Sequence, residues 1–246
     1  MLFSFVIFPF IAWLPLGYED LIDSISCEQH ELFIAFDTNV HVEAKAVYPS
    51  FTEDSSFHCY ANESLKNDAT RRFDNYVQQL RFAQEDVNEN DLDRDFIFRY
   101  YPIYCGPHLI SIYGYEYQYW SLPHGWFHHV GKTFWARPDG SVKEVDFTDM
   151  FIGDATCFIL DYSNHYFKSH RYGYYSYEEE YWPDPLNERD LESFVLLEKG
   201  LLLIFSMYRV WGFGDGPDTL LIPYADLKPI INPNGPISTL AEADKF

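Results

Sequence analysis

Basic residues are scarce in this chain of 246 residues. Only 17 Lys and Arg stand against 38 Asp and Glu, so the formal net charge at pH 7 is −21. A nucleic-acid partner would need a basic patch to meet its phosphates, and an anionic membrane surface would repel such a chain. The composition therefore excludes nucleic acid and favours a cationic partner, which the negative field would attract over a long range.

Motifs of known catalytic or cofactor chemistry are also missing. The sequence has no G-x-S-x-G elbow, P-loop, H-E-x-x-H pair or C-x-x-C. The densest histidine group is His124, His128 and His129. Neighbouring residues of a strand point to opposite faces, so His128 and His129 would not bind one metal ion together. We therefore expect no metal, no cofactor and no enzyme activity.

Cysteine is sparse, and its four copies are far apart in the sequence: Cys27, Cys59, Cys105 and Cys157. An even number in an exported chain permits two disulfides, for which three pairings exist. We expect Cys27–Cys59 and Cys105–Cys157, because each pair lies within one half of the chain.

The first residues are almost wholly apolar, since Leu2–Leu16 reads LFSFVIFPFIAWLPL. A transmembrane helix needs about 20 such residues, and Pro9 and Pro15 disfavour a helix further. The length fits the hydrophobic region of a signal peptide, although no basic residue precedes it and no A-x-A cleavage site follows. Residues 1–17 are interpreted as a signal peptide or a short anchor, with a buried strand as the alternative. We expect no other membrane insertion, and a secreted, periplasmic or outer-envelope location.

The most informative segment runs from Phe194 to Leu227. Two apolar runs flank Glu198-Lys199-Gly200, which is typical of a hairpin turn. A third run, Thr219–Tyr224, follows a glycine-rich loop and leads into the short helix start Ala225-Asp226-Leu227. This pattern predicts a three-stranded β-meander with a helical cap.

Residue spacing predicts the other elements. Alternation from Phe36 to Ala46 indicates a half-buried strand or a bent hairpin. Between residues 62 and 84 the apolar positions follow a helical period, with one stripe that contains Leu65, Ala69 and Leu80. Further strands are expected at 96–104, 109–120, 127–136 and 142–145, and helices within 152–170 and near 187–192.

Aromatic residues are abundant, at 20% of the chain. Many belong to strands, where a ring packs on the sheet, and the rest would supply an exposed surface for a partner. The candidate contact residues are expected in two loops: His124, Trp126 and His128 in the first, and Tyr174, Tyr177, Tyr181 and Trp182 in the second. The acids Glu178, Glu180 and Asp184 lie among the second group, so a glycan hydrolase with paired carboxylates is the alternative.

Several short motifs follow one another in a fixed order: Tyr48-Pro49 after a long strand, Asn62 and Leu65 opening a helix, Pro123-His124-Gly125, Asp139-Gly140-Ser141 before Phe147–Phe151, Gly200–Phe205, Gly214–Gly216, and Ile222–Leu227. In this order they resemble the RsiV/PdaC-type family of bacterial envelope domains. At the first turn, Leu122-Pro123 stands where that family has Gly-Ala.

The resemblance implies an α+β fold with a curved antiparallel β-sheet and helices packed on one face. It also implies export or membrane anchoring. One class of members is an anti-sigma factor whose outer domain binds lysozyme. Another is attached to a peptidoglycan deacetylase domain that this chain lacks, so no catalytic residue is assigned by resemblance.

These observations predict four regions: a leader at 1–17, a PdaC-type strand–helix unit at 27–84, an RsiV-type α+β unit at 96–230, and a loose tail at 231–246. The predicted function is a non-catalytic, secreted or envelope-anchored binding domain for a cationic protein such as lysozyme, or for a cell-wall glycan. A purely structural envelope protein is the third alternative.

Overall fold

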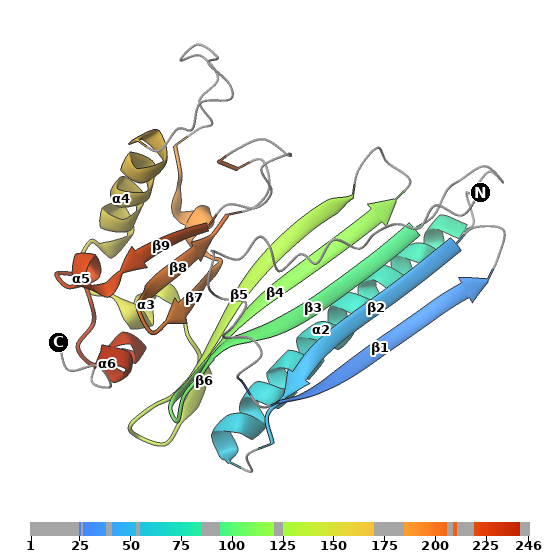
Figure 1. Cartoon of the computed structure of the whole chain (residues 1–246), viewed down its shortest axis with the longest axis horizontal. Coiled ribbons are helices and arrows are strands. Elements are labelled where there is room, and N and C mark those ends of the chain that lie inside the picture. Colours follow the sequence, from blue (N-terminus) through green and yellow to red (C-terminus); the bar gives the residue numbers. More distant parts are fainter. Residues whose placement is uncertain are drawn as a thin grey trace.

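The computed structural model describes residues 25, 27–37, 41–52, 55–84, 94–120, 125–169, 185–205, 209–210 and 219–241. In this part the chain forms two β-sheets, with helices on the outer side of each (Figure 1). The predicted α+β class is confirmed. The leader at 1–17 lies outside the described residues. No helix in the described ranges combines the length and the apolar character that crossing a membrane requires.

The large sheet has six strands in the order of the chain. Its strands are β1 (Glu28–Asp37), β2 (His41–Ser50), β3 (Arg94–Cys105), β4 (Leu109–Trp120), β5 (Trp126–Ala136) and β6 (Val142–Glu144). The predicted bent hairpin at 36–46 is the junction of β1 and β2. The sheet differs from the expected antiparallel one in a single pairing, because β3 runs parallel to β2. A long helix joins these two strands and returns the chain to the same end of the sheet.

That crossover helix is α2 (Ser56–Gln84), which packs on one face of the large sheet (Figure 1). It begins earlier than predicted because Ser55 caps it: the Ser55 hydroxyl accepts a hydrogen bond from the His58 amide at 3.2 Å. The predicted apolar stripe faces the sheet, where Leu65, Ala69 and Leu80 are buried. The stripe fixes which side of the helix meets the strands.

The predicted meander is confirmed as the three-stranded sheet β7 (Phe194–Leu197), β8 (Gly200–Ile204) and β9 (Thr219–Pro223). Its cap is α5 (Tyr224–Leu227), and the Tyr224 hydroxyl donates to the carbonyl of Leu197 at 2.8 Å. One face of this sheet packs on the large sheet, on the side opposite α2.

The other face of the small sheet is covered by short helices: α3 (Phe147–Met150), α4 (Ala155–Ser169), η3 (Glu188–Leu191) and α6 (Pro236–Ala241). Asp146 begins α3 with a capping box. The tail expected to be loose instead contains α6, whose Ile237 and Leu240 are buried. Pro236 stands at the start of α6, where a fixed φ favours a helix and the missing amide costs nothing.

The predicted units 27–84 and 96–230 share the large sheet, since β2 pairs with β3 and α2 packs on both. The assignment of these two units to the PdaC and RsiV types stays a prediction.

At Gly131, β5 of the large sheet lies against the backbone of β7 in the small sheet. A Cβ atom added there would lie 1.9 Å from the carbonyl oxygen of Phe194 on β7. The hydroxyl of Ser193 joins the strands at the same place, because it accepts from the Gly131 amide at 3.1 Å and donates to the His129 carbonyl at 3.3 Å. Only a residue without a side chain allows this contact.

Replacing Gly131 by Ala should therefore push backbone against backbone and cost about 3 kcal/mol of unfolding free energy. Gly140 is the matched control, since its φ is 83° but no atom lies within 4 Å of an added Cβ. Gly140→Ala should cost about 1 kcal/mol, through backbone strain alone. Urea unfolding of both variants measures the difference, and equal losses would contradict the steric argument.

Candidate functional site

Two of the predicted contact residues lie together on β5. Trp126 and His128 are two positions apart on one strand, so they share a face, and both are exposed. Trp126 is 58% exposed, the largest fraction among the large apolar side chains of the described residues. His124, Tyr174, Tyr177, Tyr181 and Trp182 lie outside the described residues, as do Glu178, Glu180 and Asp184.

Polar residues of β4 stand directly opposite this pair. Gln118 is the register partner of Trp126, and Glu116 is the partner of His128. Opposed side chains in an antiparallel pair lie close together on the same face. An exposed indole ring is therefore flanked by an amide, a carboxylate and an imidazole.

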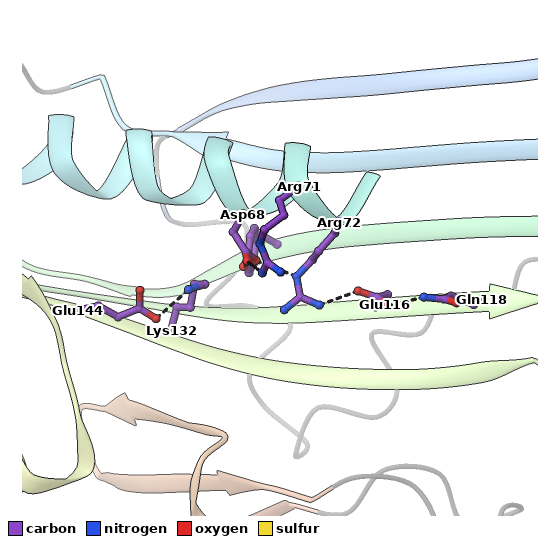
Figure 2. Close-up of polar contacts among 8 residues, drawn as sticks. Asp68, Arg71, Arg72, Glu116, Gln118, Lys132 and Glu144 are labelled. Atoms are coloured by element: carbon purple, nitrogen blue, oxygen red, sulfur yellow. Dashed lines mark hydrogen bonds and ion pairs between the residues drawn. The ribbon is translucent and has the colours of Figure 1, made fainter. Parts of the chain in front are cut away.

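A chain of hydrogen bonds holds these polar groups in place. The Trp120 indole donates to Gln118 at 3.1 Å, and the Gln118 amide donates to Glu116 at 2.7 Å. Arg72 of α2 donates to the second Glu116 oxygen at 2.6 Å, so the chain crosses from the sheet to the helix (Figure 2). The groups beside Trp126 are thus ordered without any ligand.

The chain ends at Asp68 of α2. Arg72 Nε donates to Asp68 at 2.8 Å, and Arg71 and the Tyr100 hydroxyl donate to the same carboxylate (Figure 2). Burial alone would raise the pKa of Asp68, but the hydrogen bonds from Tyr100 and Arg72 outweigh burial and lower it to about 2. Asp68 stays ionised at neutral pH and holds no proton to donate there.

Sequence reasoning missed this network. Arg72 lies outside the apolar stripe from which the helix is predicted, and Glu116 stands among the tyrosines of β4. The available signal is the single acid within the apolar strand LISIYGYEYQYW, since a half-buried carboxylate needs a cationic partner.

His129 lies on the opposite face of β5 from His128, as the alternation predicts. It is 3% exposed between the sheets, where its Nδ1 shares a hydrogen bond of 2.5 Å with the Tyr113 hydroxyl. Burial lowers the pKa of His129 to about 3, and nearby His128 adds to the effect. His129 is therefore neutral and serves as part of the packing between the sheets. Within the described ranges, no group of three or more His, Cys, Asp or Glu residues is arranged to hold a metal ion.

A cavity of about 640 Å³ opens beside the junction of the two sheets. Its walls come from β5, β6, α3, α4, η3 and β7, so residues distant in the sequence meet around it. The cavity is separate from the Trp126 face and was not predicted from the sequence.

The four cysteines all lie in the described part of the chain, and no disulfide joins any two of them there. The predicted pairs Cys27–Cys59 and Cys105–Cys157 are not formed in the structure. Cys27 instead accepts a hydrogen bond from Gln29 at 3.3 Å. A hydrogen bond to Asp154 and the negative charge of that carboxylate raise the pKa of Cys157, which disfavours the thiolate that disulfide formation requires. Two cysteines that lie in the same half of the sequence are therefore not necessarily paired in the fold.

Comparison with known proteins gives the fold. No family model matches the chain, and no curated protein matches it in sequence. A solved structure of a DUF3298 family member from Bacteroides fragilis is similar at a TM-score of 0.63 and 14% identity, covering 89% of this chain and 98% of that one. A DUF3298 family protein from Pseudomonas aeruginosa is similar at a TM-score of 0.62 and 13% identity, covering 85% and 96%. The chain therefore has the fold of these uncharacterised bacterial proteins.

Removing Arg72 should be costly because two mostly buried carboxylates lose a cation: Glu116 loses Arg72, and Asp68 keeps only the exposed Arg71. Asp68 and Glu116 side chains are only 11% and 12% exposed. Arg72→Met should cost about 3 kcal/mol of unfolding free energy, whereas Lys132→Met should cost less than about 1 kcal/mol. The control lysine pairs with Glu144, which is 40% exposed. Adding Glu116→Gln to Arg72→Met should recover part of the loss in urea unfolding; no recovery would contradict the electrostatic reason.

Acid should destabilise the protein through His129. The unfolded imidazole gains a proton near pH 6.5, while the folded one resists it down to about pH 3. Stability should therefore fall with pH below 6.5, by up to about 1.4 kcal/mol per unit from this group. The double variant His129→Phe/Tyr113→Phe should have a shallower dependence between pH 7 and pH 4.5 in urea unfolding. The same slope as the wild type would refute this assignment.

Proposed function

We propose that this chain is a non-catalytic binding domain, secreted or held at the cell envelope, that binds a cationic protein. The observation that carries the proposal is the exposed ring of Trp126 beside His128, on a strand whose polar neighbours are already ordered. An exposed tryptophan flanked by hydrogen-bonding groups is typical of the residues that dominate binding energy in protein interfaces.

The charge supports a cationic partner. Even if each of the 17 basic residues paired with one acid, 38 − 17 = 21 acids would have no basic partner within the chain. Such a surplus accelerates association with a positively charged protein and makes the association rate sensitive to salt. Lysozyme, a cationic enzyme that acts on the cell wall, is a suitable probe of this chemistry.

The described carboxylates beside Trp126 are better suited to ordering the surface than to acid–base chemistry. Glu116 accepts hydrogen bonds from Arg72 and Gln118, and the low pKa of Asp68 removes it as an acid near pH 7. The alternative of a glycan hydrolase that uses Glu178, Glu180 or Asp184 stays a prediction, since these residues lie outside the described part of the chain.

A cell-wall glycan is the second candidate ligand. An exposed indole stacks on a sugar ring, and the neighbouring Gln118 and His128 would bind its hydroxyls. The charge surplus has no role in binding a neutral sugar, so we favour the protein partner.

Calorimetric titration with lysozyme tests the proposal. Trp126→Ala should weaken binding by about tenfold or more, because a tryptophan anchor contributes at least about 2 kcal/mol. Phe33→Ala is the matched control, because Phe33 is 55% exposed but lies on β1 at the far edge of the sheet. The control should change the affinity less than about twofold.

The same titration at about 20 mM and about 200 mM salt should show weaker binding at the higher concentration. No complex at either concentration would exclude lysozyme as a partner. Binding of purified cell-wall glycan that is lost in Trp126→Ala would assign the surface to the sugar instead.

A further inference from the structure

The cavity beside the sheet junction has the dimensions of a ligand pocket. Its volume of about 640 Å³ falls within the range of about 300–1,000 Å³ in which proteins hold small molecules or single side chains. The cavity is lined by Gly131, Thr133, Glu144, Val145, Asp146, Phe147, Thr148, Thr156, Glu188, Leu191, Glu192 and Phe194. It lies on the side of β5 that meets β7, away from Trp126.

Part of the lining is apolar and rigid. Val145, Leu191 and Phe194 are buried, and the rings of Phe147 and Phe194 meet edge to face with centroids 6.3 Å apart. The Gly131 contact fixes Phe194 against the large sheet. An aliphatic stem would be desolvated against these side chains, and a flat cation would find an aromatic face.

The remaining wall carries four carboxylates, and they differ in their partners. Lys132 pairs with Glu144 at 2.8 Å, and Lys143 pairs with Asp146 at 3.1 Å. Glu188 and Glu192 form no ion pair with any residue in the described ranges, and both are exposed. Glu188 and Glu192 therefore give the pocket two negative charges that no ion pair within the described ranges balances.

We propose that this pocket binds the side chain of an arginine presented by a polypeptide. The guanidinium group of this arginine lies between Glu188 and Glu192. The three methylene groups of its side chain pack on Phe147, Leu191 and Phe194. Arginine fits better than lysine because its planar group forms two parallel hydrogen bonds with a carboxylate and also stacks on an aromatic ring. This inference rests on the proposed function in one respect: the cationic partner protein supplies the arginine.

Small probes test the pocket without that partner. The probe is N-acetyl-arginine amide, and N-acetyl-citrulline amide has nearly the same shape without the charge. In an NMR titration of the whole chain, the arginine probe should shift the backbone amides of Gly131, Thr148 and Glu192. The citrulline probe should bind at least about fivefold more weakly, since it cannot pair with a carboxylate.

Two pairs of substitutions remove the same charge from different places. Glu188→Gln/Glu192→Gln should weaken arginine binding by about fivefold or more. Glu63→Gln/Asp74→Asn changes two exposed acids of α2, and it should alter the binding by less than about twofold. If both double variants weakened arginine binding equally, the proposal would be overturned, because the loss of two negative charges anywhere on the protein would explain the result.

Equal affinity for arginine and citrulline, or shifts outside the pocket only, would also overturn it. Tighter binding of agmatine than of the capped arginine would reject a polypeptide source and assign the pocket to a free amine. Trp126→Ala should leave this titration unchanged. If Trp126→Ala loses lysozyme binding but still binds the arginine probe, the Trp126 surface and the arginine pocket are independent sites, and each proposal can fail without the other.

Discussion

The contact of Gly131 with the backbone of Phe194 is the constraint on which the rest of the structure depends. It brings the small sheet against the large one at a distance that no side chain permits, and the Ser193 hydroxyl, next to β7, hydrogen-bonds the backbone of Gly131 and His129 on β5. Around this point Tyr113, Val195 and Leu202 form a core of their own between the sheets. Because Gly131 and Phe194 also line the cavity, the same contact determines the shape of the pocket.

Whether an acidic residue of this chain has a basic partner depends on its exposure to solvent. Between α2 and β4, where solvent is mostly excluded, the carboxylates of Asp68 and Glu116 are matched by Arg72. An unpaired charge there would be costly, since neither bulk water nor a counter-ion would compensate it. Glu188 and Glu192 are exposed, so water solvates them without a basic partner. The surplus charge consequently collects at the surface, where a cationic ligand can approach it.

Local sequence patterns predicted most of the elements correctly. The meander was predicted because apolar runs alternate with turn residues, and β4 because tyrosine recurs at every second position from Tyr113 to Tyr119. Pro102 cannot donate to a strand ladder, and β3 has a bulge there, with a shift in register between Pro102 and Tyr104. The parallel pairing of β2 with β3 was not readable, because the same alternation fits either direction. The α6 helix was missed because prolines near it were taken to mark a loose end.

What the sequence alone determined is the local geometry and the charge: which residues alternate on a strand, which stripe of α2 is apolar, and how many acids exceed the bases. It also indicated Trp126 and His128 as candidate contact residues, but it expected them in a loop, whereas they share one face of β5. Only the tertiary structure decided that Arg72 meets Glu116, 44 positions away, and that α3 and η3 close a cavity against β5. The reason is physical. Periodicity depends on bonds between neighbouring residues, whereas pairing across a core depends on how whole sheets and helices bury their apolar faces together.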